Sequence, residues 1–131
     1  MKNKFFLPFL LIIVSALLFT GCVPQSPANA PEIGTAEAYS LYQKGETFFV
    51  DVREQDEWDA VHIPNTTLIP LGQVASRLSE IPKDKNIVVV CRSGNRSQSG
   101  RDILLQAGYT NVTSMAGGIT DWTKQGYPVE P

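Results

Sequence analysis

Residues 86–108 constrain the fold of this chain more than any other segment. Ile87, Val88, Val89 and Val90 form a continuous β-branched run, which is typical of a parallel strand covered on both faces. After Ser97 the apolar stripe of a helix follows, formed by Gly100, Ile103, Leu104 and Ala107, and Gly108 is placed to end it. Cys91 therefore begins a polar loop at the carboxyl end of a strand, facing a helix amino terminus. Ligands bind at this edge of open α/β sheets, so Cys91 is the leading candidate for chemistry.

The remaining segments also alternate between strand and helix patterns. Strands are expected at residues 47–52, 67–70 and 111–115, and helices at residues 35–44, 54–59, 73–81 and from residue 118 onward. Thr35 is expected to cap the first helix, and Trp58 and Trp122 are expected to turn into the core. This alternation predicts one α/β domain over residues 33–131, with a small parallel sheet and helices on both faces.

The amino-terminal residues have the layout of an export signal. Two lysines precede the apolar run Phe5–Phe19, which as a helix would span only about 22 Å, short of the roughly 30 Å hydrocarbon core of a membrane. The segment ends in Phe19-Thr-Gly-Cys22, which resembles a bacterial lipobox. Residues 1–21 are thus predicted to be a lipoprotein-type signal, and residues 22–32 a tether with lipid on Cys22. Cleavage after Ala30 is the alternative.

A lipid on Cys22 predicts an exported bacterial membrane lipoprotein that faces the periplasm or the cell exterior. Loss of residues 1–21 lowers the Lys and Arg count from 11 to 9 against 13 acidic residues, which leaves a net charge of −4. Nucleic acid is therefore not an expected partner. The positive charge that remains is expected to gather around the Cys91 loop, on Arg92, Arg96 and Arg101.

Cys91 is predicted to be reactive rather than structural. With Cys22 lipidated or removed, Cys91 is the one thiol left, and it is followed by polar or small residues. A buried structural cysteine is the alternative. Backbone amides around Gly94, the helix amino terminus and the nearby arginines can stabilise a thiolate without a dedicated base. The chain has a single histidine, His62, so neither a Cys–His pair, a zinc site nor any other cofactor is expected.

From about residue 33 to residue 130 the chain resembles the single-domain rhodaneses, the thiosulfate sulfurtransferase family. The motifs that carry the resemblance are Val50-Asp-Val-Arg-Glu54, Glu57-Trp58, His62-Ile-Pro64, Cys91-Arg-Ser-Gly-Asn-Arg96, Gly108-Tyr109 with Val112, Gly117-Gly118 with Trp122, and Gly126-Tyr-Pro128-Val129. The resemblance implies a three-layer sandwich. It also implies that Cys91 takes a sulfane sulfur from thiosulfate or a similar anionic donor and passes it, as a persulfide, to a thiol or cyanide.

The same resemblance implies roles for the neighbours of Cys91. The amides of Arg92, Ser93, Gly94, Asn95, Arg96 and Ser97 would hold the persulfide, and the guanidinium groups of Arg92 and Arg96 would attract the donor. Asp51 and Arg53 are expected to support the loop through an ion pair or hydrogen bonds. Ser97 is expected to cap the following helix and to donate within the loop.

One motif departs from the family pattern, in which His62-Ile63-Pro64 is usually preceded by glycine and followed by Gly-Ala. Here Val61 precedes it, and Asn65 and Thr66 follow. Asn65 can take a positive φ angle, whereas Val61 cannot do so cheaply, so the turn must be shaped differently. His62 is expected to be structural.

Three alternative functions stay open. A persulfide carrier that docks on a protein acceptor would use the same cysteine without turnover. A redox sensor would oxidise Cys91 to sulfenic acid. A cysteine-dependent phosphatase is a weaker fit, because that chemistry uses Cys and Arg separated by five residues, and Cys91 and Arg96 have four between them.

Overall fold

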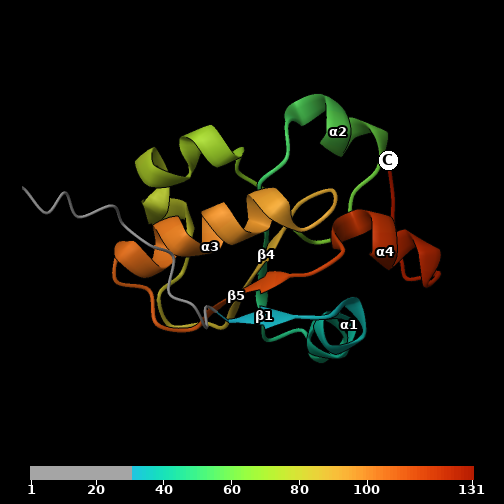
Figure 1. The fold of residues 1–131 in the computed structure, drawn as a ribbon, viewed down its shortest axis with the longest axis horizontal. Coiled ribbons are helices and arrows are strands. Elements are labelled where there is room, and N and C mark those ends of the chain that lie inside the picture. The colour runs from blue at the N-terminus through green and yellow to red at the C-terminus, as the bar shows by residue number, and fades with distance from the viewer. Residues whose placement is uncertain (1–30) are drawn as a thin grey trace, which may run out of the picture.

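A five-stranded parallel sheet forms the centre of the molecule (Figure 1). Its strands are β1 (Glu32–Ile33), β2 (Phe48–Asp51), β3 (Thr67–Leu68), β4 (Ile87–Val90) and β5 (Val112–Met115). Their order is β1-β5-β4-β2-β3, so β4 is central, and it pairs with β2 and β5 along most of its length. The predicted parallel sheet is confirmed, and the strand that precedes Cys91 is its middle strand.

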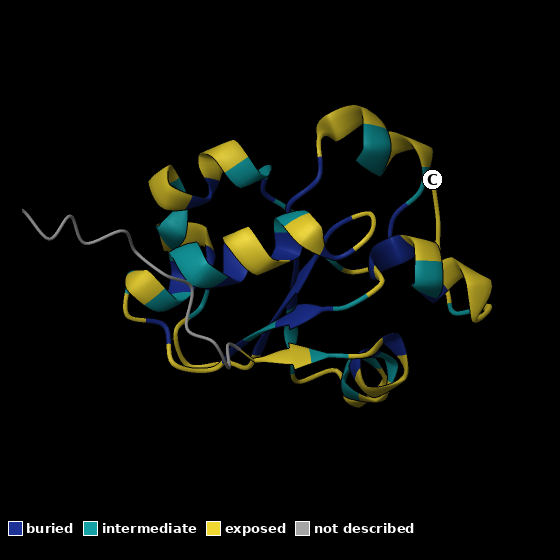
Figure 2. Cartoon of the chain, in the orientation of Figure 1, coloured by how far each residue is buried: buried dark blue, intermediate teal, exposed yellow. Residues whose placement is uncertain are grey.

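Helices cover both faces of this sheet, as predicted. They are α1 (Thr35–Lys44), α2 (Gln55–Ala60), α3 (Asn95–Gln106) and α4 (Gly118–Lys124), with two 3-10 segments, η1 (Leu71–Ser76) and η2 (Leu78–Glu80). Alternate residues of β4 serve the two faces. Val89 packs in one apolar cluster with Leu104 of α3, and Val88 packs in the other with Trp122 of α4. The inner strands β2, β4 and β5 are largely buried, the edge strands β1 and β3 less so, and the outer helix surfaces are exposed, which completes a three-layer sandwich (Figure 2).

The structure is a computed structural model and describes residues 31–131. The predicted signal, lipid attachment at Cys22 and most of the tether lie outside the described residues. Within residues 31–131, no helix has both the length and the apolar character needed to cross a membrane. Both apolar clusters are complete within this segment, so it contains the core that a self-folding domain needs.

The helix α3 lies unusually close to the sheet because Gly100 faces it. A Cβ atom on Gly100 would lie 3.0 Å from Cγ1 of Val89 and 3.2 Å from Cγ1 of Val52. Both valines are fully buried and have little room to move. The close approach fixes where the amino end of α3 meets the loop of Cys91.

The prediction of an α-helix over residues 73–81 is wrong. Two 3-10 segments stand there, with hydrogen bonds between residues three apart, such as Arg77 N–H to the Val74 carbonyl at 3.1 Å. The hydroxyl of Tyr109 donates to the carbonyls of Leu78 and Ile81, at 2.8 and 3.0 Å. This tertiary contact, which a helical pattern does not encode, satisfies carbonyls at the end of the segment.

Two further side-chain predictions are corrected. Gly34, not Thr35, occupies the N-cap of α1, and the Thr35 hydroxyl instead donates to Oδ2 of Asp121 in α4. Trp58 is partly exposed rather than a core residue, because the six-residue α2 buries none of its side chains. Trp122 is fully buried, as predicted.

Candidate active site

The loop that holds Cys91 lies between the end of β4 and the start of α3, near α2 and α4 (Figure 1). Gly94, with φ of 106°, turns the chain into α3, which therefore begins at Asn95, two residues before Ser97. The side chain of Cys91 is buried, and the Gly94 N–H donates to its Sγ atom at 3.1 Å. The sulfur is thus held against a backbone N–H donor of its own loop.

The backbone of the loop is fixed by α4. The carbonyls of Cys91 and Arg92 accept hydrogen bonds from the N–H groups of Ile119 and Thr120, at 2.9 and 3.1 Å. Gly118 lies against the same carbonyls: a Cβ atom there would lie 2.4 Å from the Cys91 oxygen and from the Arg92 oxygen. The contact between α4 and the loop therefore requires glycine at position 118, because a side chain there would push α4 away from the loop.

Asp51 and Arg53 form the predicted ion pair, fully buried at the end of β2. The Arg53 Nη2 atom lies 2.7 Å from Oδ2 of Asp51 and also donates to the carbonyl of Val61 at 2.8 Å. A further bond runs from Arg53 Nη1 to the carbonyl of Glu57 at 3.3 Å. These contacts tie the end of β2 to α2 and to Val61. Arg53 thus supports the site through α2, because its hydrogen bonds run to α2 and Val61 rather than to residues 91–97.

Glu57 on α2 is the site residue to which sequence reasoning gave no role. Its two carboxylate oxygens accept from both terminal nitrogens of Arg96, at 2.7 and 2.8 Å. Chiefly through these bonds, and with help from the Glu54 N–H, the pKa of Glu57 falls from 4.5 to about 2. The acidic N3 position of a capping box is a sequence signal that could have drawn attention to Glu57.

Arg96 interacts electrostatically with Cys91 although its side chain is paired with Glu57. The bonds to Glu57 are the main cause that raises the pKa of Arg96, and electrostatic interactions with the nearby Cys91 and Asp51 raise it further. Arg96 therefore stays charged beside the loop, in a direction that α2 fixes. Its engagement with Glu57 also argues against a phosphatase, in which this arginine would bind the phosphoryl group.

The three arginines expected around the loop do not all gather there. Arg92 is exposed beside Cys91, and no acceptor among residues 31–131 pairs with its side chain. Arg101 is buried on α3 and turns away, with Nη1 bonded to Oγ of Ser114 at 2.8 Å and to the carbonyl of Pro31 at 3.3 Å. The prediction for Arg101 is wrong, because nearly two turns of α3 separate it from the loop and β5 offers a buried acceptor.

The other predicted loop residues lie at the amino end of α3. Ser93 and Asn95 are exposed, and Ser97 is buried. The Ser97 hydroxyl donates to the Gly94 carbonyl at 2.8 Å, so it closes the loop, as predicted, but the helix cap is Gly94. The first-turn amides of α3 have no carbonyl partner within the helix, which leaves them available to an anion.

His62 is structural, as predicted. Its Nδ1 atom lies 3.0 Å from the carbonyl of Trp58, its ring stacks on that indole at 3.9 Å, and its Nε2 atom lies 3.3 Å from a carboxylate oxygen of Glu130. The turn next to it also follows the expectation: Asn65 has φ of 60°, and Val61 is extended with φ of −165°. His62 thus joins α2 to the end of the chain.

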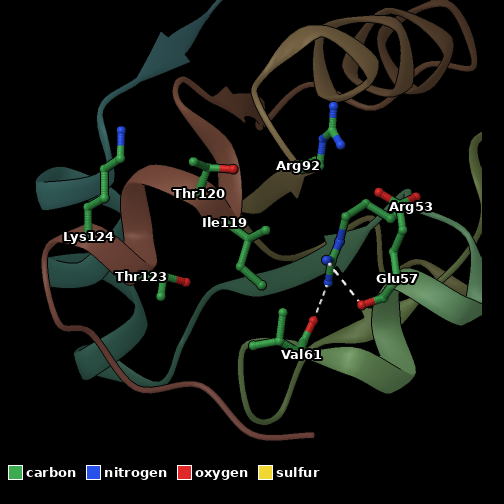
Figure 3. Close-up of a pocket in the computed structure, with 8 residues that line it drawn as sticks. All are labelled: Arg53, Glu57, Val61, Arg92, Ile119, Thr120, Thr123 and Lys124. Atoms are coloured by element: carbon green, nitrogen blue, oxygen red, sulfur yellow. Dashed lines mark hydrogen bonds between the residues drawn. The ribbon is translucent and has the colours of Figure 1, made fainter.

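A pocket of about 520 Å³ opens between α2 and α4 beside the loop (Figure 3). It is lined by Arg53, Glu57, Val61, Arg92, Ile119, Thr120, Thr123 and Lys124. Within residues 31–131, no cluster of three or more His, Cys, Asp or Glu side chains could hold a metal ion. The lining combines three cationic side chains and one acidic side chain with two threonines and two apolar residues.

The chain belongs to the rhodanese-like domain family, whose model matches residues 35–125. A sulfurtransferase of Allochromatium vinosum is 38% identical over 84 residues, which cover 64% of this chain and 78% of that protein. The thiosulfate sulfurtransferase GlpE of Pseudoalteromonas translucida is 31% identical over 90 residues, which cover 69% and 86%. A rhodanese-related protein of Thermoplasma volcanium has a similar structure, with a TM-score of 0.70, 32% identity, and coverage of 76% and 97%.

The pairing of Glu57 with Arg96 predicts a pH-dependent stability. We expect Glu57→Gln to lower the free energy of unfolding by about 1–2 kcal/mol at neutral pH. The reason is that a neutral amide then replaces the carboxylate that accepts both hydrogen bonds from Arg96. The pKa of Glu57 is depressed in the folded state, so this contribution is fully present above pH 4.5 and is lost as the pH falls toward 2.

Urea unfolding of both proteins between pH 7 and pH 2 measures this difference. Glu80→Gln is the matched control, since Glu80 also pairs with an arginine, Arg77, but on the exposed surface; its effect should be smaller. A difference for Glu57→Gln that stays constant over this pH range would contradict the assignment.

Proposed function

We propose that this protein is a sulfurtransferase that moves a sulfane sulfur from thiosulfate, or a similar anionic donor, to a thiol or cyanide. By homology it is a thiosulfate sulfurtransferase-like enzyme, since the relatives named above include a sulfurtransferase and a thiosulfate sulfurtransferase. The observation that carries the proposal is the Cys91 sulfur, buried at the end of β4 and bonded by the Gly94 N–H at 3.1 Å.

The first half of the cycle loads Cys91. The thiolate attacks the outer sulfur of thiosulfate, the S–S bond of the donor breaks, and sulfite leaves with its electron pair. Cys91 then carries a persulfide anion, and the charge on the two sides balances at −3. In the second half, a thiolate or cyanide takes the outer sulfur, and the Cys91 thiolate returns.

The charged groups of the site suit this cycle. The amide of Gly94 and the first-turn amides of α3 would hold the persulfide anion. Arg92, exposed and unpaired among the described residues, would attract the donor dianion from solution. Arg96, held by Glu57, would supply fixed positive charge beside the sulfur rather than reach for the donor.

Incubation of residues 31–131 with thiosulfate should add one sulfur atom to the protein. Intact-mass spectrometry measures the gain, which cyanide should reverse and which Cys91→Ser should abolish, because no other thiol is present in this segment. The absence of any mass gain with thiosulfate or other sulfane donors would refute the persulfide mechanism.

A second candidate function is that of a persulfide carrier, which would load the same cysteine and deliver the sulfur to a protein acceptor. A putative sulfur carrier protein, YrkF of Bacillus subtilis, is 31% identical to this chain over 100 residues, which cover 54% of that protein. A redox sensor is less well supported, because residues 31–131 contain no second cysteine that could resolve a sulfenic acid on Cys91.

Kinetics with thiosulfate and cyanide separate an enzyme from a carrier. An enzyme should release sulfite and thiocyanate steadily, in large excess over the protein concentration. We expect this result, because the pocket next to the loop, lined by Arg92, Ile119 and Thr120 among others, has room for a small acceptor. One stoichiometric load, followed by negligible turnover with cyanide and every small thiol, would favour the carrier. Hydrolysis of an aryl phosphate, with thiosulfate inert, would instead indicate a phosphatase.

We further propose that the protein is anchored to the bacterial envelope by lipid on Cys22, with the domain outside the cytoplasm. The support comes from the apolar run Phe5–Phe19 and the lipobox-like Phe19-Thr-Gly-Cys22. Stable anchoring needs more than one acyl chain, and a diacylglyceryl group supplies two.

Radioactive fatty acid should label the wild-type protein in a bacterial host and leave Cys22→Ala unlabelled. The label is expected to disappear because the Cys22 sulfur is the proposed attachment atom, and Cys91→Ser is the matched control that should keep it. Equal labelling of wild type and Cys22→Ala would reject the anchor.

A further inference from the structure

The pocket between α2 and α4 combines apolar walls with free positive charge. Ile119 and Val61 approach each other across it (Figure 3) and pack in the same apolar cluster. Thr120 and Thr123, on the exposed side of α4, add methyl groups and hydroxyls. A purely hydrophilic ion such as thiosulfate has no apolar part to match such walls.

Four charged side chains line the pocket, and two of them are already committed. Arg53 is paired with Asp51, and Glu57 with Arg96. Arg92 and Lys124 are exposed, and neither has an acceptor among residues 31–131. They lie on opposite sides of Ile119 (Figure 3). The pocket therefore has an unpaired positive charge at the end next to Cys91 and another at the end of α4.

We propose that this pocket binds the sulfur acceptor, and that the acceptor is a thiol with a short aliphatic body and a terminal carboxylate. The inference rests on the sulfurtransferase function proposed above. The aliphatic body would lie along Ile119 and Val61, with the carboxylate at Lys124. The thiol would lie at the other end, beside Arg92, which directly follows Cys91 and whose cationic charge favours the thiolate form.

The contacts of α4 determine which end of the pocket lies next to the loop of Cys91. The N–H groups of Ile119 and Thr120 bind the carbonyls of Cys91 and Arg92, so the wall of the pocket begins at the loop itself. Lys124 stands at the far end of the same helix, and five residues of helix span about 7.5 Å. A chain of about five carbon atoms can therefore lie along this stretch of α4, where the flexible Lys124 side chain can meet its carboxylate.

The transfer needs no further reactant. The acceptor thiol loses its proton to solvent, and its thiolate attacks the outer sulfur of the Cys91 persulfide. A new S–S bond forms on the acceptor, the S–S bond at Cys91 breaks, and Cys91 leaves as a thiolate. The acceptor departs as a persulfide with its carboxylate unchanged.

Binding of hexanoate to residues 31–131, followed by NMR chemical shifts, tests the pocket apart from any sulfur chemistry. Hexanoate should shift the signals of Ile119, Thr120 and Lys124, and it should bind several-fold more tightly than acetate or 1-hexanol, because each of those lacks one of the two groups that the pocket recognises. Shifts elsewhere, or equal affinity for the three compounds, would overturn the inference.

Turnover with matched thiols tests the acceptor role. With thiosulfate as donor, kcat/KM should be roughly fivefold higher for 6-mercaptohexanoate than for 6-mercaptohexan-1-ol, whose thiol is similarly basic. Lys124→Gln should bring this ratio close to one, and Lys124→Glu should invert it. Lys44→Gln, in the last turn of α1, is the matched control and should leave the ratio unchanged.

The apolar wall makes a separate prediction. The preference for 6-mercaptohexanoate over 3-mercaptopropionate should fall about two- to fourfold in Val61→Ala, because the shorter side chain buries less of the aliphatic body. Val61 is extended and binds Arg53 only through its carbonyl, so this variant keeps that contact.

The failures of the two proposals are distinguishable. A protein that forms the Cys91 persulfide but shows no carboxylate or chain-length preference would overturn the acceptor inference and leave the sulfurtransferase intact. A protein that binds hexanoate but takes up no sulfur would overturn the proposed function, and the acceptor assignment with it. A chain-length preference confined to the loading step would assign the pocket to the donor.

Discussion

The site depends on the contact between the amino end of α4 and the backbone of the loop. Two N–H groups of α4 bind the carbonyls of Cys91 and Arg92, and Gly118 has no side chain to keep the helix away. With these carbonyls turned to α4, the peptide units of the loop have a fixed orientation, and the Gly94 N–H meets the sulfur. Residues more than 20 positions apart thus set the chemistry of one thiol.

A second, charged framework surrounds this backbone contact. The buried pair of Arg53 and Asp51 joins the end of β2 to α2, and α2 in turn presents Glu57 to Arg96. Removing either partner of the buried pair would leave an uncompensated charge, which is a large energetic cost. The cationic side chains of the site thus divide into two kinds. Arg53 and Arg96 are held in fixed directions by acidic partners, whereas Arg92 and Lys124 have no partner among residues 31–131 and can meet a ligand.

The sequence was sufficient for strands β2 to β5, for the position of Cys91 and for the special turn at Asn65, because each follows from local rules on β-branched runs, strand ends and φ angles. The two-residue edge strand β1 was not predicted, since only its pairing with β5 defines it. It was insufficient where a distant partner decides. Arg101 turns to Ser114, Thr35 to Asp121, and Tyr109 to the carbonyls of the 3-10 segment. The pairing of Glu57 with Arg96 belongs to the same class, since these residues lie 39 positions apart.

The direction of β1 also bears on how the domain would be presented to its surroundings. The Pro31 carbonyl accepts from the Ser114 N–H, and β1 pairs with Ser114 and Met115, so β1 runs parallel to β4 and points to the edge where β4 ends in Cys91. The chain therefore enters the sheet behind the reactive sulfur along the strand direction. In the anchored protein proposed above, the attachment would join the domain from that side and leave the loop of Cys91 at the far end of the strands.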